Sequence, residues 1–169
     1  MSAGTLISLE EYLHTPYSPD WEFRDGALVE RNLGDEAHSV LQIALGAYFH
    51  RRRKRWNIRA YTELRIKIRD SWYPISDVCV YPLPAPKERF PSQPPLLWIE
   101  ILSEDDRMRE VWEKAAELVK CGVPYVWIID PITLESDLFT VEGRTAISDK
   151  TFRLPNSPIV IPLAEVMEE

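Results

Sequence analysis

The chain has 169 residues, of which 45% are hydrophobic and 28% charged, and its formal net charge is -7. These values are typical of a globular protein, and the length suits a single domain over residues 1–169 with one sizeable core. The negative charge argues against a protein that coats nucleic acid through bulk electrostatic attraction. No segment has the roughly 18 consecutive apolar residues of a membrane-spanning helix, and the N-terminus lacks the pattern of a signal peptide, so we expect a cytoplasmic protein with no membrane partner.

Basic residues are concentrated in one part of the sequence. Residues 51–70 carry 9 basic and 2 acidic side chains, including five consecutive cations from Arg51 to Arg55. A stripe that faces phosphate groups is one interpretation of this run. The other is the solvated last turn of a helix, where cations complement the helix dipole and the free carbonyl groups.

The two cysteines, Cys79 and Cys121, lie in separate apolar segments. Neither has a second cysteine nearby in the sequence, so buried free thiols are expected rather than a disulfide or a zinc site. Redox chemistry is therefore not indicated.

The first 31 residues contain signals for a helix and a hairpin. Ser8 is followed three residues later by Glu11, which is the form of a capping box, and this predicts a short helix that ends before Pro16. Asp25-Gly26 then separates two short segments, residues 21–24 and 27–31. Because both central residues of a tight hairpin turn must tolerate positive φ, this dipeptide predicts a β-hairpin.

The middle of the chain predicts a long helix and then three strands. Apolar residues recur at three-and-four spacing from Asp35 to about Arg55, as on an amphipathic helix. Residues 58–69 alternate between apolar and polar types, which indicates a strand with one wet face. Residues 73–81 and 96–102 are apolar on both faces, as central strands are. Between them, residues 82–95 hold six prolines and are expected to form an extended loop.

A second helix and a fourth strand follow. Asp105 or Asp106 can cap the helix, and Gly122 with Pro124 ends it. The next apolar segment, residues 125–129, should lie parallel to residues 96–102, because a strand, a helix and a strand with short joints form a right-handed crossover. Weaker strand signals occur near residues 138–141 and 159–161.

The predicted fold class is therefore α/β or α+β. The core order is helix, strand, strand, strand, helix, strand around a mixed sheet with helices against it. An N-terminal helix and hairpin precede this core, and a small C-terminal β appendage follows it.

Two acidic residues occupy positions that otherwise belong to the core. Asp77 lies between Ile75 and Cys79 on one face of its strand, and Glu100 lies in an equally apolar strand. Burial of an unpaired carboxylate costs several kcal/mol or raises its pKa. A shared Mg²⁺ or Mn²⁺ ion would explain both residues, because carboxylate and carbonyl oxygens suit these ions. Hydrogen bonds at a strand end, or pairs with arginine, are the alternative.

Lys114 falls at the border of the apolar face of the second helix. That helix packs back across the strand of Glu100, so a cation from it could assist the ionisation of a water molecule and offset phosphate charge. The alternative is a lysine whose stem covers apolar surface while its ammonium group reaches solvent.

This combination resembles the core of the PD-(D/E)XK nucleases. More narrowly, it resembles a large bacterial family of restriction-endonuclease-like proteins, over about residues 10–135. The matching sequence blocks are Asp25-Gly26 with Leu28-Val29-Glu30, His38, Ser76-Asp77-Val78, residues 99–103, Glu113-Lys114, and residues 122–131. The sequence departs from the superfamily pattern at Ser76, where proline is usual, and at Leu102, where a lysine would stand. The resemblance implies that Lys114 takes the place of that lysine, displaced to the following helix.

The resemblance implies a restriction endonuclease-like core and assigns roles to its residues. Asp77, Glu100 and the carbonyl group of Ile101 would bind the metal, and Lys114 would position the attacking water. Glu30 could extend the site as a metal ligand and His38 as a phosphate contact or acid, with a solvated hairpin carboxylate and a capping histidine as the alternatives.

Two classes of function follow from these observations. The first is a metal-dependent nuclease with Mg²⁺ or Mn²⁺ as cofactor and nucleic acid, expected to be DNA, as substrate; a homodimer would let two sites address both strands. The second is a catalytically silent relative that binds nucleic acid or self-associates. His14 and His50 match no motif and are expected at the surface. The chain has no phosphate loop, dinucleotide-binding fingerprint, nucleophile elbow or His-Glu-x-x-His zinc motif.

Overall fold

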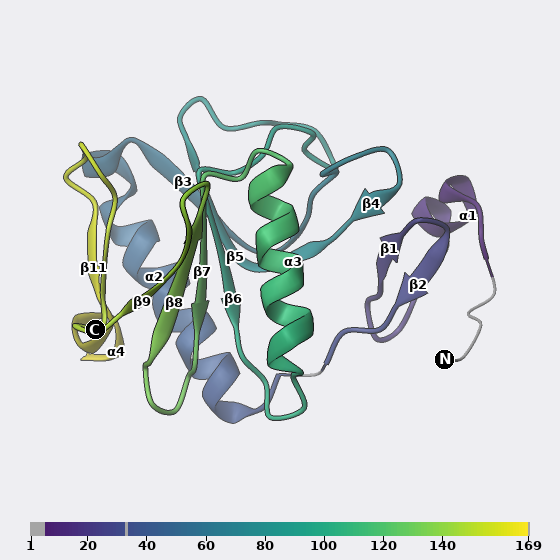
Figure 1. Cartoon of the computed structure of the whole chain (residues 1–169). Helices are drawn as coiled ribbons and strands as arrows, with labels where there is room; N and C mark the ends of the chain where they lie inside the picture. The colour runs from purple at the N-terminus through teal and green to yellow at the C-terminus, as the bar shows by residue number, and fades with distance from the viewer. Residues whose placement is uncertain (1–5, 33, 169) are drawn as a thin grey trace.

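The computed structural model describes residues 6–32 and 34–168. Its centre is a six-stranded mixed sheet with the order β3-β5-β6-β7-β8-β9 (Figure 1). Only β6 and β7 are parallel, as the sequence predicts, and all other neighbours are antiparallel. The strands of this sheet are β3 (Ile58–Arg65), β5 (Ile75–Pro82), β6 (Leu97–Ile101), β7 (Tyr125–Ile129), β8 (Ser136–Thr140) and β9 (Gly143–Ile147).

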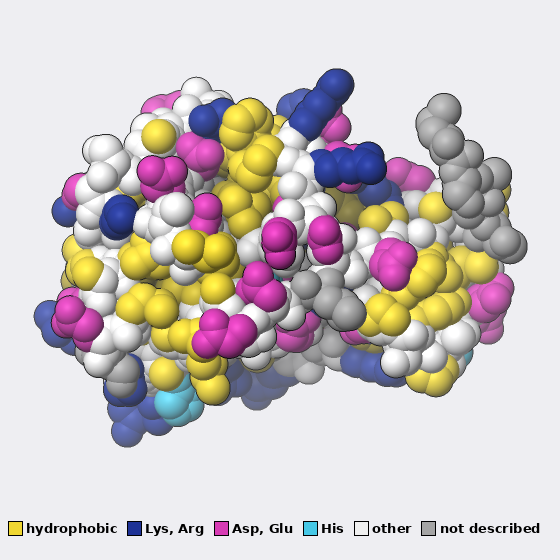
Figure 2. All heavy atoms as spheres, turned by 90° about the horizontal axis from the view of Figure 1, so that it is seen from below, with side chains coloured by type: hydrophobic (Ala, Val, Ile, Leu, Met, Phe, Trp, Pro, Cys, Tyr) yellow, Lys and Arg dark blue, Asp and Glu magenta, His cyan; other side chains and the backbone are white. Residues whose placement is uncertain are grey.

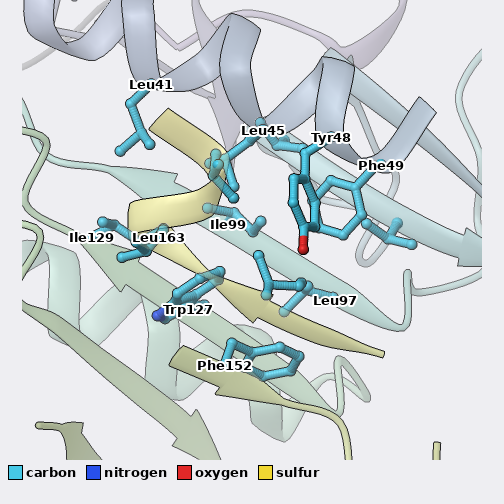
Figure 3. Close-up of a cluster of buried hydrophobic side chains, with 14 of the residues drawn as sticks. Leu41, Leu45, Tyr48, Phe49, Leu97, Ile99, Trp127, Ile129, Phe152 and Leu163 are labelled. Carbon is cyan, nitrogen blue, oxygen red and sulfur yellow. The ribbon is translucent and has the colours of Figure 1, made fainter. Parts of the chain in front are cut away.

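The two long helices, α2 (Glu36–Trp56) and α3 (Met108–Lys120), bury their apolar faces against opposite faces of the sheet. Leu41, Leu45, Tyr48 and Phe49 of α2 pack against alternate side chains of the strands (Figure 3). Ala115 and Leu118 of α3 pack on the other face. Because successive strand residues point to opposite faces, a sheet covered on both faces needs apolar residues at nearly every position of its central strands. β7 has such residues throughout, and β5 has them except at Ser76 and Asp77. The predicted mixed sheet flanked by helices is therefore confirmed.

The ends of these helices show which capping signals are used. Asp35 caps α2, since its side chain accepts a hydrogen bond from the backbone N–H of His38. The basic run ends the same helix, and Arg52 lies 3.5 Å over the ring of Tyr48. The prediction that Asp105 or Asp106 caps the N-terminus of α3 is wrong. Arg107 is its N-cap and makes no side-chain cap, because Asp106 instead accepts from the backbone N–H of Ser103 at 2.7 Å.

The N-terminal elements form a second, smaller sheet with the order β2-β1-β4. Ser8 caps the first helix and both residues of the Asp25-Gly26 turn have positive φ, so the predicted helix and hairpin are confirmed. The predicted strand at 73–81 is divided at Pro74, which has no N–H for a ladder, and its first part joins the small sheet. The elements are α1 (Leu9–His14), β1 (Glu22–Arg24), β2 (Ala27–Val29) and β4 (Trp72–Tyr73), around buried Tyr12, Phe23 and Tyr73.

The C-terminal prediction is wrong in part. β8 and β9 extend the central sheet, and only β10 (Thr151–Arg153) and β11 (Val160–Pro162) form a separate hairpin. A short helix, α4 (Leu163–Glu168), was not predicted. β9 is an edge strand with almost every residue exposed, so it lacks the apolar alternation that would indicate it in the sequence.

None of the helices in the described part of the chain combines the length and the apolarity that a bilayer crossing requires. Both cysteines are free thiols; Cys79 is buried as predicted, whereas Cys121 is only half-buried.

Candidate active site

A cleft of about 360 Å³ lies between the small sheet, α3 and the ends of β5 and β6. Its lining contains every side chain that the sequence singled out, although these residues come from five different segments of the chain. They are Glu30, His38, Asp77, Glu100 and Lys114, and Ile101 lies beside them.

Asp77 on β5 is 3% exposed and has partners on both carboxylate oxygens. Its Oδ1 accepts a hydrogen bond from Arg31 at 2.9 Å, and its Oδ2 accepts one from the backbone N–H of Ile101 at 2.7 Å. The ring of His38 lies 3.4 Å from Oδ2. Burial alone raises the pKa of Asp77, but His38, then the Ile101 N–H and the Arg31 charge outweigh it, so that the pKa is held below its usual value.

The pKa of Glu100, on β6, is shifted in the opposite direction to that of Asp77. Its Oε1 accepts from the indole N–H of Trp98 at 2.7 Å and lies 2.8 Å from the ammonium group of Lys114. Burial raises the pKa of Glu100 to about 7. The Lys114 charge opposes this shift, whereas the nearby carboxylates of Asp77 and Glu22 add to it. The site thus contains two carboxylates whose pKa values are displaced in opposite directions, which is common at functional sites.

Lys114 points into the cleft from α3. Its Nζ lies between Glu100, at 2.8 Å, and Glu22, at 2.9 Å, and 5.8 Å from the ring centre of Trp98. Burial by itself lowers the pKa of Lys114, but the Glu100 and Glu22 charges raise it overall, so the ammonium form is favoured. A lysine that merely covers apolar surface would send its ammonium group to solvent, and this one does not.

His38 and Glu30 are placed differently. His38, in the first turn of α2, is buried, with its ring against Asp77. A β-carbon built on Gly34 would stand 2.5 Å from the ring nitrogen Nδ1, so a side chain at position 34 would collide with this ring. Glu30, just after β2, is exposed at the mouth of the cleft. His14 and His50 are exposed, as predicted.

Four further residues complete the site without having been predicted. Arg31 bridges Asp77 and Glu63, and Gln42 donates to the backbone carbonyl of Asp77 at 3.0 Å. Glu22 forms the second ion pair of the Lys114 ammonium group, beside the one with Glu100. Glu63 has a φ of 52° within β3, where a side chain other than glycine is strained. In the sequence, each of these polar residues stands where a polar side chain is ordinary, so no local pattern marks them.

The donor set suits a hard divalent cation. Asp77 and Glu100 offer carboxylate oxygens, and the N–H of Ile101 faces β5, so its carbonyl group is directed to the same edge of β6. Burial is the main cause of the raised pKa of Glu100, with smaller additions from Asp77 and Glu22, and a bound cation would favour the ionised carboxylate. Within residues 6–32 and 34–168 no three acidic, histidine or cysteine side chains already surround one metal position, so water or a phosphate would have to complete the ligands.

The surface around the cleft is acidic. Asp106, Glu110 and Glu113, near the start of α3, line its outer part. Figure 2, which views the molecule from below, shows several acidic side chains gathered near the middle of that view. A polyanion would therefore be repelled from the mouth of the cleft unless cations accompany it.

Comparison with known proteins gives one matching family model and five chains of solved structures that match. The family model described as "Uma2: Putative restriction endonuclease" matches residues 9–165. A crystal structure described as "a putative nuclease belonging to DUF820", from Anabaena variabilis, superposes with a TM-score of 0.81 at 21% identity, and the match covers 96% of this chain and 98% of that one. No curated protein matches the sequence. With nearly its whole length matched by the family model and a fold that agrees, the chain belongs to the Uma2 family of restriction-endonuclease-like proteins.

Proposed function

We propose that this protein is a metal-dependent nuclease that hydrolyses phosphodiester bonds, with DNA as its substrate. The observation that carries the proposal is the meeting of Lys114 from α3 with Glu100, in the same cleft as Asp77. Family membership and the structural neighbour support nuclease function in general.

Asp77, Glu100 and the carbonyl group of Ile101 are the groups that would hold Mg²⁺ or Mn²⁺. Such an ion supplies Lewis acidity and lowers the pKa of a bound water. Glu100 is suited to this role because burial disfavours its ionised form, which a bound cation would stabilise. The acidic residues at the mouth of the cleft also favour a bound cation, because they would repel a phosphate group unless cations accompany it.

Lys114 would orient the attacking water and stabilise the negative charge that develops during the attack. Its ammonium group donates hydrogen bonds, so it can orient a water oxygen and stabilise negative charge as the oxygen attacks phosphorus. The new P–O bond forms as the bond to the leaving sugar oxygen breaks, with attack and departure in line. His38 and Arg31 contact Asp77, and the guanidinium group of Arg31 and the protonated form of His38 would complement a phosphate.

The decisive experiment is metal-dependent cleavage by wild type and matched variants. Supercoiled plasmid, linear duplex, single-stranded DNA and RNA would be incubated with Mg²⁺ or Mn²⁺, with EDTA as the blank. We expect Asp77→Asn and Lys114→Ala to abolish cleavage with the far-ultraviolet circular dichroism spectrum unchanged. Lys120→Ala, an exposed lysine at the end of the same helix, is the control and should cleave normally.

Two results would contradict the proposal. Wild type that cleaves none of these substrates with either ion would favour a silent nucleic-acid-binding relative. Full cleavage by Lys114→Ala would remove this lysine from the mechanism.

A further inference from the structure

Glu22 is a buried acidic residue outside the predicted set of site residues. It lies on β1 of the small sheet, and its side chain is 7% exposed. Its Oε1 accepts a hydrogen bond from Lys114 Nζ at 2.9 Å and another from the backbone N–H of Ile75 at 3.0 Å. One oxygen atom thus joins the small sheet, α3 and the first residue of β5.

Lys114 has a particular need for this second carboxylate. A lysine side chain is a flexible four-carbon stem with a compact charge, so one partner fixes its ammonium group poorly. Its other partner is Glu100, at 2.8 Å, which is also a proposed metal ligand. When a divalent cation binds Glu100, the ammonium group and the cation compete for the same carboxylate and repel each other. Glu22 stands on the other side of Nζ and remains available to hold it.

We propose that Glu22 is a positioning residue that keeps Lys114 at the active site when Glu100 binds metal. The inference rests on the proposed nuclease function. Glu22 acts through Lys114 and through its own bond to β5, which fixes the carboxylate relative to Asp77 two residues further along that strand.

A purely structural role for Glu22 is the competing explanation, and the chain offers a matched control for it. Glu117 lies three residues after Lys114 on α3 and forms ion pairs with Arg24 on β1 and with Arg69. It therefore also fastens the small sheet to α3, but among the described residues no hydrogen bond or ion pair joins it to Lys114. If fastening were the only function of Glu22, Glu117→Gln and Glu22→Gln would have equal effects on catalysis.

The first test compares rates at saturating metal. We expect Glu22→Gln to lower kcat by about 10- to 100-fold with little change in KM, the size of effect that a small displacement of a catalytic group produces. Glu22→Asp, which keeps the charge, should recover part of the loss, and Glu117→Gln should stay within about 2-fold of wild type. Equal losses for Glu22→Gln and Glu117→Gln would overturn the proposal.

A second test needs no substrate. The ¹⁵N-labelled ammonium group of Lys114 would be observed by NMR, identified by its absence in Lys114→Arg, with and without Mg²⁺. In wild type and Glu117→Gln we expect slow proton exchange that survives addition of Mg²⁺. In Glu22→Gln we expect the signal to be lost when Mg²⁺ is added.

The two tests separate the failure of this inference from the failure of the proposed function. Wild type without cleavage but with the expected NMR pattern would retain the positioning role and reject the nuclease. Cleavage by wild type together with an intact Lys114 signal in Glu22→Gln at saturating Mg²⁺ would reject the positioning role and retain the nuclease.

Discussion

The side chain of Asp77 accepts a hydrogen bond from the backbone N–H of Ile101, with 2.7 Å between Oδ2 and N. The regular pairing of β5 and β6 ends one residue earlier, at Val78 and Ile99, and the next residues on the two strands are Asp77 and Glu100. A carboxylate oxygen therefore takes the place of a ladder carbonyl. The strands stay joined at this point while the acidic groups are presented to the cleft, which explains how a sheet interior accommodates them.

Asp77→Asn should destabilise the protein as well as inactivate it. The ionised form of Asp77 is favoured by Arg31, His38 and the Ile101 N–H, and its pKa is lowered in the folded state. We expect the free energy of unfolding at pH 7 to fall by about 1 to 3 kcal/mol. A lowered folded pKa gives stability above the unfolded pKa of about 3.9 that is lost as the pH falls through the folded value. Urea unfolding from pH 7 down to pH 3 measures this, and a difference that grows toward low pH would contradict it.

Glu100→Gln should have the opposite effect on stability. Because the folded pKa of Glu100 is raised from 4.5 to about 7, ionisation of this group favours the unfolded state. The stability contributed by protonated Glu100 is fully present below pH 4.5 and is lost as the pH rises through about 7. The glutamine variant escapes this loss, so at pH 8 we expect it to be more stable by about 1 to 3 kcal/mol. The same unfolding series would measure it, and a variant less stable than wild type at pH 8 would refute the assignment.

Divalent metal should stabilise wild type. With a dissociation constant of about 1 mM, 10 mM Mg²⁺ would add about 1.4 kcal/mol, which corresponds to a rise in Tm of about 3 to 6 °C. Asp77→Asn should show no rise, whereas Asp149→Asn, which removes an exposed carboxylate, should behave as wild type. Differential scanning calorimetry with and without EDTA provides the measurement. Equal rises in all three proteins would indicate weak binding elsewhere on the surface.

Gly34→Ala should displace the ring of His38. A β-carbon at position 34 would lie 2.5 Å from Nδ1, closer than real contacts allow. Burial lowers the pKa of His38, but the hydrogen bond and the charge of Asp77 outweigh it and leave the pKa above 6.5. If the ring leaves Asp77, its pKa should return toward the ordinary value, which NMR titration of the ring protons would show. An unchanged pKa in Gly34→Ala would mean that the loop, rather than the ring, gives way.

Local sequence signals predicted the elements that carry the site. The capping box at Ser8, the Asp25-Gly26 turn and the apolar periodicity of α2 each depend on residues within a few positions, and each is found in the structure. The parallel pairing of β6 and β7 followed from chain connectivity. The predictions failed for two reasons. Asp106 could accept a hydrogen bond from more than one backbone N–H, and it accepts from Ser103 instead of capping α3. The edge strand β9 is exposed, so it has no apolar pattern that would indicate a strand.

The sequence by itself determined the mixed sheet, the positions of Asp77 and Glu100 on apolar strands, and the helix that carries Lys114. Burial of a carboxylate needs compensation whatever its partner is, so the pattern alone marked these two residues. Only the tertiary structure decided which partners compensate them. Arg31 and Glu22 lie 46 and 92 residues from the side chains they bind, and such pairs depend on how the small sheet packs against α3, which no local pattern records.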